Sequence, residues 1–287
     1  GCIDCHTGSG LMGPGKAWDY ARQAVDIQCE DCHRNQGERV VPADWPQKLA
    51  GYKAVVPNRT FLVTRRGGTP LWHVEIDGER LWLHRKLAGG RLKIPLWGHA
   101  SHPRAEDDHA RLDCTACHSR WAPQCHGCHV QYQTQRRQWD HQAGRATPGR
   151  WKESRWLIRN ELPPLGVTVA GRIRPFVPGM ILSIEHPAWE QPRFRRLFAS
   201  VSPHTSGAAR SCRSCHRASD AVGLGQGQLH RHQGEWRFLP AQPLLIDGLP
   251  ADAWTELGGK SEGESIRPGD RAFRAAEIQR ILETELP

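Results

Sequence analysis

The sequence has no long hydrophobic run. A membrane-spanning helix needs about 18 or more consecutive apolar residues, whereas the longest candidate, residues 176–184, is short and contains Pro178 and Gly179. Hydrophobic residues make up only 38% of the 287 positions, which is little for burying the core of so long a chain. Gly and Pro are frequent instead, with 29 and 21 copies. The chain is therefore predicted to lack a spanning helix and to contain little regular secondary structure.

The sequence also has no unpaired cysteine. Its ten cysteines form five pairs, each pair encloses two residues, and a His follows each pair. In chain order, motifs 1 to 5 are Cys2, Cys5 and His6; Cys29, Cys32 and His33; Cys114, Cys117 and His118; Cys125, Cys128 and His129; and Cys212, Cys215 and His216. Disulfides would not need the His, zinc ribbons use C-x-x-C pairs without it, and thioredoxin-like motifs do not occur in fives.

The sequence C-x-x-C-H is the attachment signature of a c-type haem. Two thiols at this spacing add to the two vinyl groups of one porphyrin, and the His that follows supplies the proximal iron ligand. Motifs 3 and 4 are separated by only six residues, which predicts two haems close together. This pair is the expected middle of an electron relay, with motifs 1 and 2 on one side and motif 5 on the other.

At these five motifs the chain resembles the multihaem c-type cytochromes. The resemblance implies five covalent haems c with mostly bis-His iron, export in an unfolded state, and a periplasmic or extracellular location. It also implies that haems make most of the core, which agrees with the low hydrophobic content and with 12 Trp against 3 Tyr. Because export needs a signal peptide and none is present, we expect a processed form or a piece of a longer chain.

The predicted fold is mixed and low in regular secondary structure: a haem-packed multihaem cytochrome with an inserted small antiparallel β segment and a C-terminal helix. Strands are predicted at 60–64, 71–76 and 80–84, a helix after Asp270, and a solvated basic face at 193–196. The expected segments are an N-terminal dihaem module (1–50), a β-meander insertion (51–97), a central dihaem module (98–145), a Pro-rich haem-free segment (146–200), and a monohaem module with the C-terminal helix (201–287).

Distal iron ligands must come from the remaining histidines. Eleven of the 16 His are left after the five proximal ones, and only two Met are present, so most irons should be bis-His and low in potential. His73 and His84 are predicted as sheet side chains and His126 as a surface residue, with ligation as the alternative for each. The ranked distal candidates are His109, His204, His102, His141 and His99, with His186 in reserve.

These features predict an electron carrier, without catalytic residues, that relays electrons between redox proteins outside the cytoplasmic membrane. Further cytochrome subunits, a homo-oligomer or a filament are the alternative assemblies. The alternative function is a multihaem oxidoreductase of nitrogen or sulfur compounds with one open iron. All five motifs keep the His that nitrite-reductase relatives often replace by Lys, which counts against that family in particular. Haem propionates would offset much of the formal charge of +9, and no nucleic-acid motif is present, so nucleic acid is not an expected partner.

Overall fold

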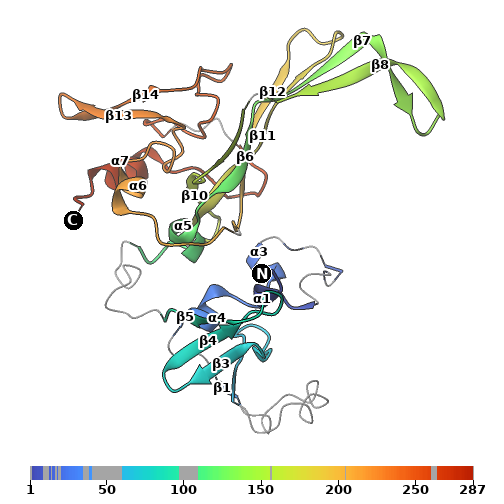
Figure 1. Cartoon of the computed structure of the whole chain (residues 1–287). Coiled ribbons are helices and arrows are strands. Elements are labelled where there is room, and N and C mark those ends of the chain that lie inside the picture. Colours follow the sequence, from blue (N-terminus) through green and yellow to red (C-terminus); the bar gives the residue numbers. More distant parts are fainter. Residues whose placement is uncertain are drawn as a thin grey trace. The chain divides into compact units, whose positions relative to one another are not determined.

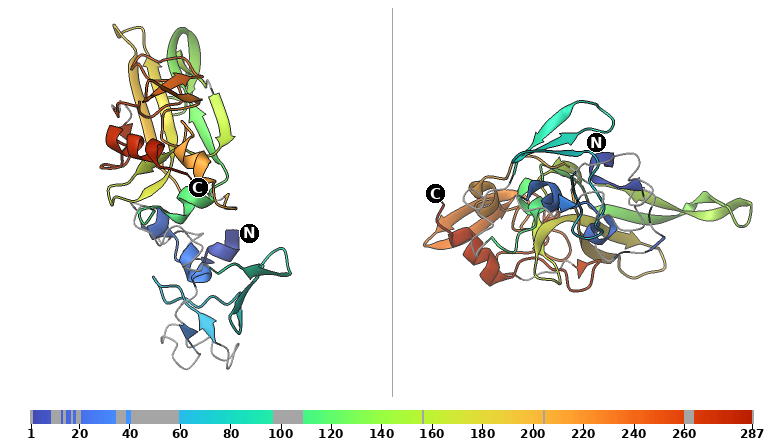
Figure 2. Two further views of the ribbon diagram at one scale, coloured as in Figure 1. Left: turned by 90° about the vertical axis from the view of Figure 1, so that its left-hand side faces the viewer. Right: turned by 90° about the horizontal axis from the view of Figure 1, so that it is seen from below.

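The computed structural model describes two compact units, residues 1–110 and 111–287 (Figure 1). Among the described residues, about 40% lie in strands and 13% in helices. Figure 2 shows the elements of each unit from two further sides. The described residues are 2–8, 13, 15, 16, 18, 21–34, 39, 40, 60–96, 109–155, 157–203, 205–259 and 264–286.

The N-terminal unit combines short helices with a small sheet. Its elements are α1 (Cys2–Cys5), α3 (Ala21–Ala24), α4 (Cys29–His33), β1 (Arg39–Val40), β2 (Phe61–Leu62), β3 (Val74–Asp77), β4 (Arg80–His84) and β5 (Arg91–Ile94). Strands β3, β4 and β5 form an antiparallel sheet in that order. Buried aliphatic side chains pack into one cluster, which contains Ile27, Leu62, Leu71, Val74, Leu81 and Ile94.

The predicted β-meander is present with a different set of strands. The expected strands at 71–76 and 80–84 correspond to β3 and β4, and Gly78 has a φ of 57° in the turn between them. The third strand of the sheet is β5, which the sequence did not predict. The expected strand at 60–64 is reduced to β2, which pairs with β1 instead.

The C-terminal unit contains an eight-stranded sheet. Its strands run in the order β15-β12-β11-β6-β9, with β10 and β7 also paired to β11, and β8 paired to β7. A separate hairpin consists of β13 and β14. The elements are α5 (Cys114–His118), β6 (Ala122–His126), β7 (Cys128–Asp140), β8 (Arg145–Ser154), β9 (Leu157–Glu161), β10 (Leu165–Val167), β11 (Ile173–Glu185), β12 (Arg193–Ser200), α6 (Cys212–His216), β13 (Gly227–His232), β14 (Glu235–Pro240), β15 (Glu264–Ser265) and α7 (Ala275–Glu283).

The predicted fold class is wrong in its content of regular structure, because the chain is mostly β. The Pro-rich segment 146–200 contains the 13-residue strand β11. Pro175 and Pro178 both lie within this strand, and the pairing of β11 with β12 shifts its register after Pro178. Proline is tolerated in strands at bulges and edges. Counting prolines therefore underestimated how much of the chain forms strands.

The expectation of a haem-packed core is also wrong for the C-terminal unit, because side chains fill its interior. Ile278 and Leu282 of α7 are fully buried in a cluster with Val222 and Leu224. A second cluster surrounds Trp254, whose ring stacks on Phe198 at a centroid distance of 4.8 Å and contacts Phe176. A helix is present near the C-terminus, where the sequence places one, and its apolar face packs inward.

Arg196 differs from the predicted solvated basic face. Its neighbour Arg195 is exposed, but Arg196 is only 1% exposed. Its guanidinium donates to both carboxylate oxygens of Asp247, at 2.6 and 2.9 Å. It also donates to the backbone carbonyls of Leu249, Pro250, Ala251 and Ala253. Strand alternation places Arg196 on the same inner face as Phe198, and this arginine holds the 247–254 segment against the sheet.

Candidate functional site

Four of the five C-x-x-C-H motifs form a single turn of helix. Motifs 1, 2, 3 and 5 coincide with α1, α4, α5 and α6. Residues three apart on a helix lie on the same face, so the two cysteines of each motif begin on one side of the turn. In motifs 2, 3 and 5 the His is the last residue of the helix. In these three motifs, two thiols and one imidazole thus project from a single turn, which is what one porphyrin requires.

The histidines of three helical motifs each make the same type of hydrogen bond, from Nδ1 to a backbone carbonyl. His33 Nδ1 donates to the Pro95 carbonyl at 2.8 Å, His118 Nδ1 to Gly207 at 3.0 Å, and His216 Nδ1 to Ile281 at 2.8 Å. A carbonyl oxygen only accepts hydrogen bonds, so the proton of each neutral imidazole lies on Nδ1. The lone pair then lies on Nε2, which is the arrangement of a metal-binding imidazole whose other nitrogen is oriented by a carbonyl.

Three other described histidines are arranged differently. His73 is buried, and its Nε2 donates to the Asp4 carbonyl at 2.8 Å. His84 Nε2 lies 2.6 Å from the Glu75 carboxylate. In His186 the roles are reversed, because Nδ1 accepts a hydrogen bond from the Ala188 backbone N–H at 3.1 Å. These contacts place a proton or a partner on Nε2 in all three.

The predicted distal ligands are only partly within the described residues. His141 is exposed in the turn between β7 and β8, and His109 is half-buried just before motif 3. His99, His102 and His204 lie outside the described residues. Of the ranked candidates, only His109 and His141 lie within the described residues, so the distal ligands remain predictions.

Motif 4 has a different backbone from the other four. Cys125 and His126 end β6, Gly127 has a φ of 69°, and Cys128 begins β7. Gly127 turns the chain between the two strands, and the two thiols remain near each other, since Cys125 is one of the groups that, after burial, raise the pKa of Cys128. His129 Nε2 also faces the Glu185 carboxylate at 3.6 Å. As folded, this motif does not present its two thiols and its His from one helical turn, as motifs 2, 3 and 5 do.

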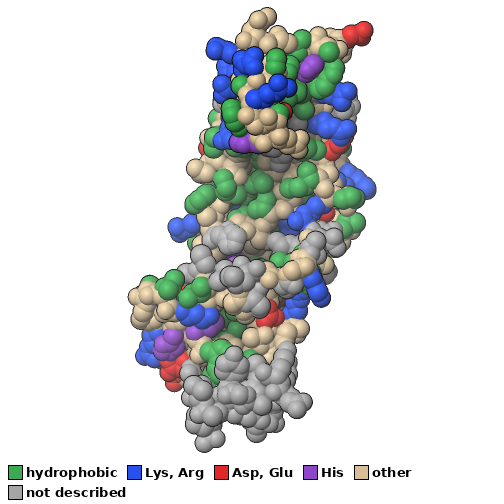
Figure 3. Space-filling model, turned by 90° about the vertical axis from the view of Figure 1, so that its right-hand side faces the viewer, with side chains coloured by type: hydrophobic (Ala, Val, Ile, Leu, Met, Phe, Trp, Pro, Cys, Tyr) green, Lys and Arg blue, Asp and Glu red, His purple; other side chains and the backbone are tan. Residues whose placement is uncertain are grey.

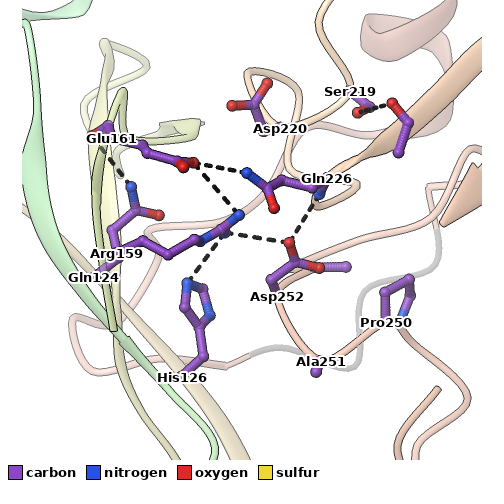
Figure 4. A network of polar contacts seen from close by, with 12 residues as sticks. Gln124, His126, Arg159, Glu161, Ser219, Asp220, Gln226, Pro250, Ala251 and Asp252 are labelled. Carbon is purple, nitrogen blue, oxygen red and sulfur yellow. Dashed lines mark hydrogen bonds and ion pairs between the residues drawn. The ribbon is translucent and has the colours of Figure 1, made fainter. Parts of the chain in front are cut away.

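His126, which was predicted to lie at the surface, is buried and 2% exposed. Burial, followed by the positive charges of Arg159 and Arg196, lowers the pKa of His126 to about 3, so the imidazole is neutral. Arg159 Nη2 lies 3.3 Å from His126 Nε2 and 3.2 Å from the Asp252 carboxylate (Figure 4). Gln226 completes the network through its backbone N–H to Asp252 at 2.9 Å. The network links strands β6 and β9 to the segment around Asp252.

Motif 3 lies against the segment that leads into motif 5. Gly207 exchanges two hydrogen bonds with His118: its N–H donates to the His118 carbonyl at 2.8 Å, and its carbonyl accepts from the imidazole. Arg210 N–H donates to the Cys117 carbonyl at 2.8 Å, two residues before Cys212. Consecutive Cα atoms are about 3.8 Å apart, so motifs 3 and 5 are close neighbours in space although about 100 residues separate them in sequence.

Each of the two N-terminal motifs contains a buried aspartate that was not predicted from the sequence. Asp4 and Asp31 each precede the second cysteine of their motif, and both are buried. Asp4 accepts a hydrogen bond from the Lys86 backbone N–H at 2.9 Å, and Asp31 accepts one from the Arg65 N–H at 3.1 Å. The repeated pattern C-x-D-C-H was visible in the sequence. It ties both motif helices to the segment that contains the β-meander.

Replacing Asp31 with alanine is expected to lower the free energy of unfolding of the N-terminal unit by about 1–3 kcal/mol. Asp31 also accepts from the Gln28 N–H at 2.7 Å, so the substitution leaves two backbone N–H groups without their acceptor. The matched control is Glu30→Ala in the same helix, expected within about 0.5 kcal/mol of wild type. Urea unfolding followed by circular dichroism compares the variants, and equal losses would contradict the anchoring role.

The alternatives to haem attachment at the C-x-x-C-H motifs are a redox-active dithiol and a metal site. Burial, followed by the charge of neighbouring Cys5, raises the pKa of Cys32 to about 12. Burial likewise raises the pKa of Cys128 and of Cys215. Catalytic dithiols have lowered pKa values instead, so these thiols do not resemble them. Within the described residues, no three or more His, Cys, Asp or Glu side chains are grouped to hold a metal ion.

No family model, curated protein or solved structure matches this chain. Among the described helices, none has the length and apolar character needed to cross a membrane.

Proposed function

We propose that this protein binds haem c covalently at its helical C-x-x-C-H motifs and carries electrons. The observation that supports this best is that His33, His118 and His216 each donate a hydrogen bond from Nδ1 to a backbone carbonyl. Each imidazole is oriented through Nδ1 by a carbonyl from a distant segment, so the neutral tautomer of each carries its proton on Nδ1. A structural His would gain the same hydrogen bond, but an iron ligand that binds through Nε2 requires this tautomer.

The residues of the chain would hold each haem through two thioether bonds and one imidazole. When bound, the haem supplies reversible one-electron chemistry. The protein supplies orientation, because the carbonyls of Pro95, Gly207 and Ile281 fix the imidazole planes and increase the basicity of Nε2. The attaching cysteines are Cys2, Cys5, Cys29, Cys32, Cys114, Cys117, Cys212 and Cys215, and the proximal ligands are His6, His33, His118 and His216.

The proposal places the protein outside the cytoplasmic membrane, because haem is attached to c-type motifs after export, and it gives the protein redox proteins as partners. Motifs 3 and 5 form the proposed central step of the relay, since the 205–210 segment joins them directly. This replaces motifs 3 and 4 as the pair through which electrons are expected to pass. The distal ligands proposed for the helical motifs are His109, His204, His102 and His99.

The decisive experiment is spectroscopy of the full chain produced with a haem-attachment system. We expect haem that resists acid-acetone extraction, a low-spin spectrum, and no spectral change when CO or cyanide is added, because bis-His irons have no open position. Extractable or absent haem would overturn the proposal. A high-spin fraction that reacts with CO would instead favour a multihaem oxidoreductase with an open iron.

A further inference from the structure

The outer part of the β7–β8 hairpin, residues 132–152 and here termed the arm, pairs with no other strand among the described residues. Strand β11 pairs with β7 only from Cys128 to Gln131, and from Tyr132 onward β7 pairs with β8 alone. The arm extends beyond the sheet (Figure 1). Both faces of a two-stranded hairpin are open to solvent, and such hairpins are marginally stable alone, so its persistence as an ordered element calls for a reason.

The base of the arm is held by aromatic packing. Tyr132 stacks on His186 at a centroid distance of 4.7 Å and meets the edge of Trp151 at 4.9 Å. His186 in turn contacts Trp189 at 5.4 Å. Gly149 has a φ of 87° and lies directly beside the Tyr132 ring, where a Cβ atom would collide with the hydroxyl. These contacts fix the direction of the hairpin.

The surface of the arm is basic and aromatic. The arm contains five basic residues and one acidic residue, Asp140, and therefore carries a formal net charge of +4, out of +9 for the whole chain. The basic residues are Arg136, Arg137, Arg145, Arg150 and Lys152. Asp140 is engaged in the turn, where it accepts from two backbone N–H groups. Trp139 and Trp151 are 56% and 41% exposed. Lys and Arg side chains gather beside hydrophobic ones at the upper end of the face in Figure 3.

This composition is that of a protein interface. Trp, Tyr and Arg are enriched in interfaces and dominate their binding energy, whereas Lys and Glu are depleted. Uncompensated positive charge selects an acidic partner and speeds its approach. The arm is itself basic, which disfavours pairing of two copies through their arms, and two exposed indole rings favour a protein surface over a duplex backbone. We infer that the arm docks an acidic protein surface, which under the proposed function is that of a redox partner.

The test compares charge reversals on two exposed hairpins of the full chain. The arm variant is R136E/R150E, and the control is R231E/R237E on the β13–β14 hairpin, which changes the net charge equally. Poly-L-glutamate is the probe, titrated by calorimetry at low and moderate salt, with duplex DNA as comparator. We expect binding by wild type to weaken with salt, the arm variant to bind at least about tenfold more weakly, and the control to change less than about twofold.

Equal weakening in both variants would overturn the inference, because net charge alone would explain binding. Tighter binding of DNA than of poly-L-glutamate would also overturn it. Thermal unfolding of each variant checks that the sheet is intact, which is expected because the substituted side chains are exposed. The haem spectrum is recorded on the same samples. Selective loss in the arm variant without a haem spectrum would support the docking surface and overturn only the proposed redox role.

Discussion

Replacing Arg196 with methionine is expected to lower the free energy of unfolding of the C-terminal unit by about 3–5 kcal/mol. The guanidinium forms an ion pair with Asp247, whose side chain is 9% exposed. Methionine fills a similar volume but leaves that carboxylate buried without a counter-charge. It also leaves the carbonyls that now accept from the guanidinium without a donor, notably Pro250 at 2.9 Å and Ala253 at 2.7 Å.

The adjacent Arg195 provides the control for this prediction. Arg195 pairs with Glu264 at 2.8 Å, but both side chains are more than half exposed, so Arg195→Met should change stability by less than about 1 kcal/mol. Urea unfolding monitored by circular dichroism measures both variants. A double variant, R196M/D247L, should recover part of the loss because it removes the unpaired carboxylate. If R195M and R196M unfold at the same urea concentration, Arg196 does not hold the 247–254 segment.

Local features of the fold were predictable where a short pattern determines them. The Asp77-Gly78 turn and the alternating strands around it predicted the β3–β4 hairpin, and the apolar spacing after Asp270 predicted α7. The C-x-x-C-H spacing identified the candidate site itself. In each case the physical cause lies within about ten residues of chain, which is the range over which sequence patterns act.

Contacts between distant segments could not be predicted. The carbonyls that orient His33, His118 and His216 lie 62, 89 and 65 residues away in sequence. The burial of His126 depends on Arg159 and Asp252, which strand pairing and a loop bring together. Arg196 looks like part of a basic run, and only the alternation of β12, once that strand is known, turns it inward. Composition also misled the fold prediction, since Gly and Pro served turns and bulges between long strands.

We expect two double cysteine substitutions, one in motif 5 and one in motif 4, to differ in their effect on haem content. We expect four covalent haems in the wild-type chain, one for each helical motif. The variant C212S/C215S should lose one of them, because α6 presents both thiols and an oriented His216 from one turn. The variant C125S/C128S should keep all four, because these thiols lie on either side of Gly127 in consecutive strands.

The haem content per chain follows from the pyridine haemochrome spectrum and intact mass. Five haems in wild type, or the loss of one in C125S/C128S, would show that Cys125–His129 leaves the strand conformation when haem is attached. That rearrangement would break the pairing of Cys125 with Ile158 and of Cys128 with Leu182. It would also free His126 from Arg159. The alternative result is four haems in wild type, lost only when the cysteines of a helical motif are replaced. It would mean that the sheet, rather than the C-x-x-C-H signature, decides which cysteine pairs carry haem.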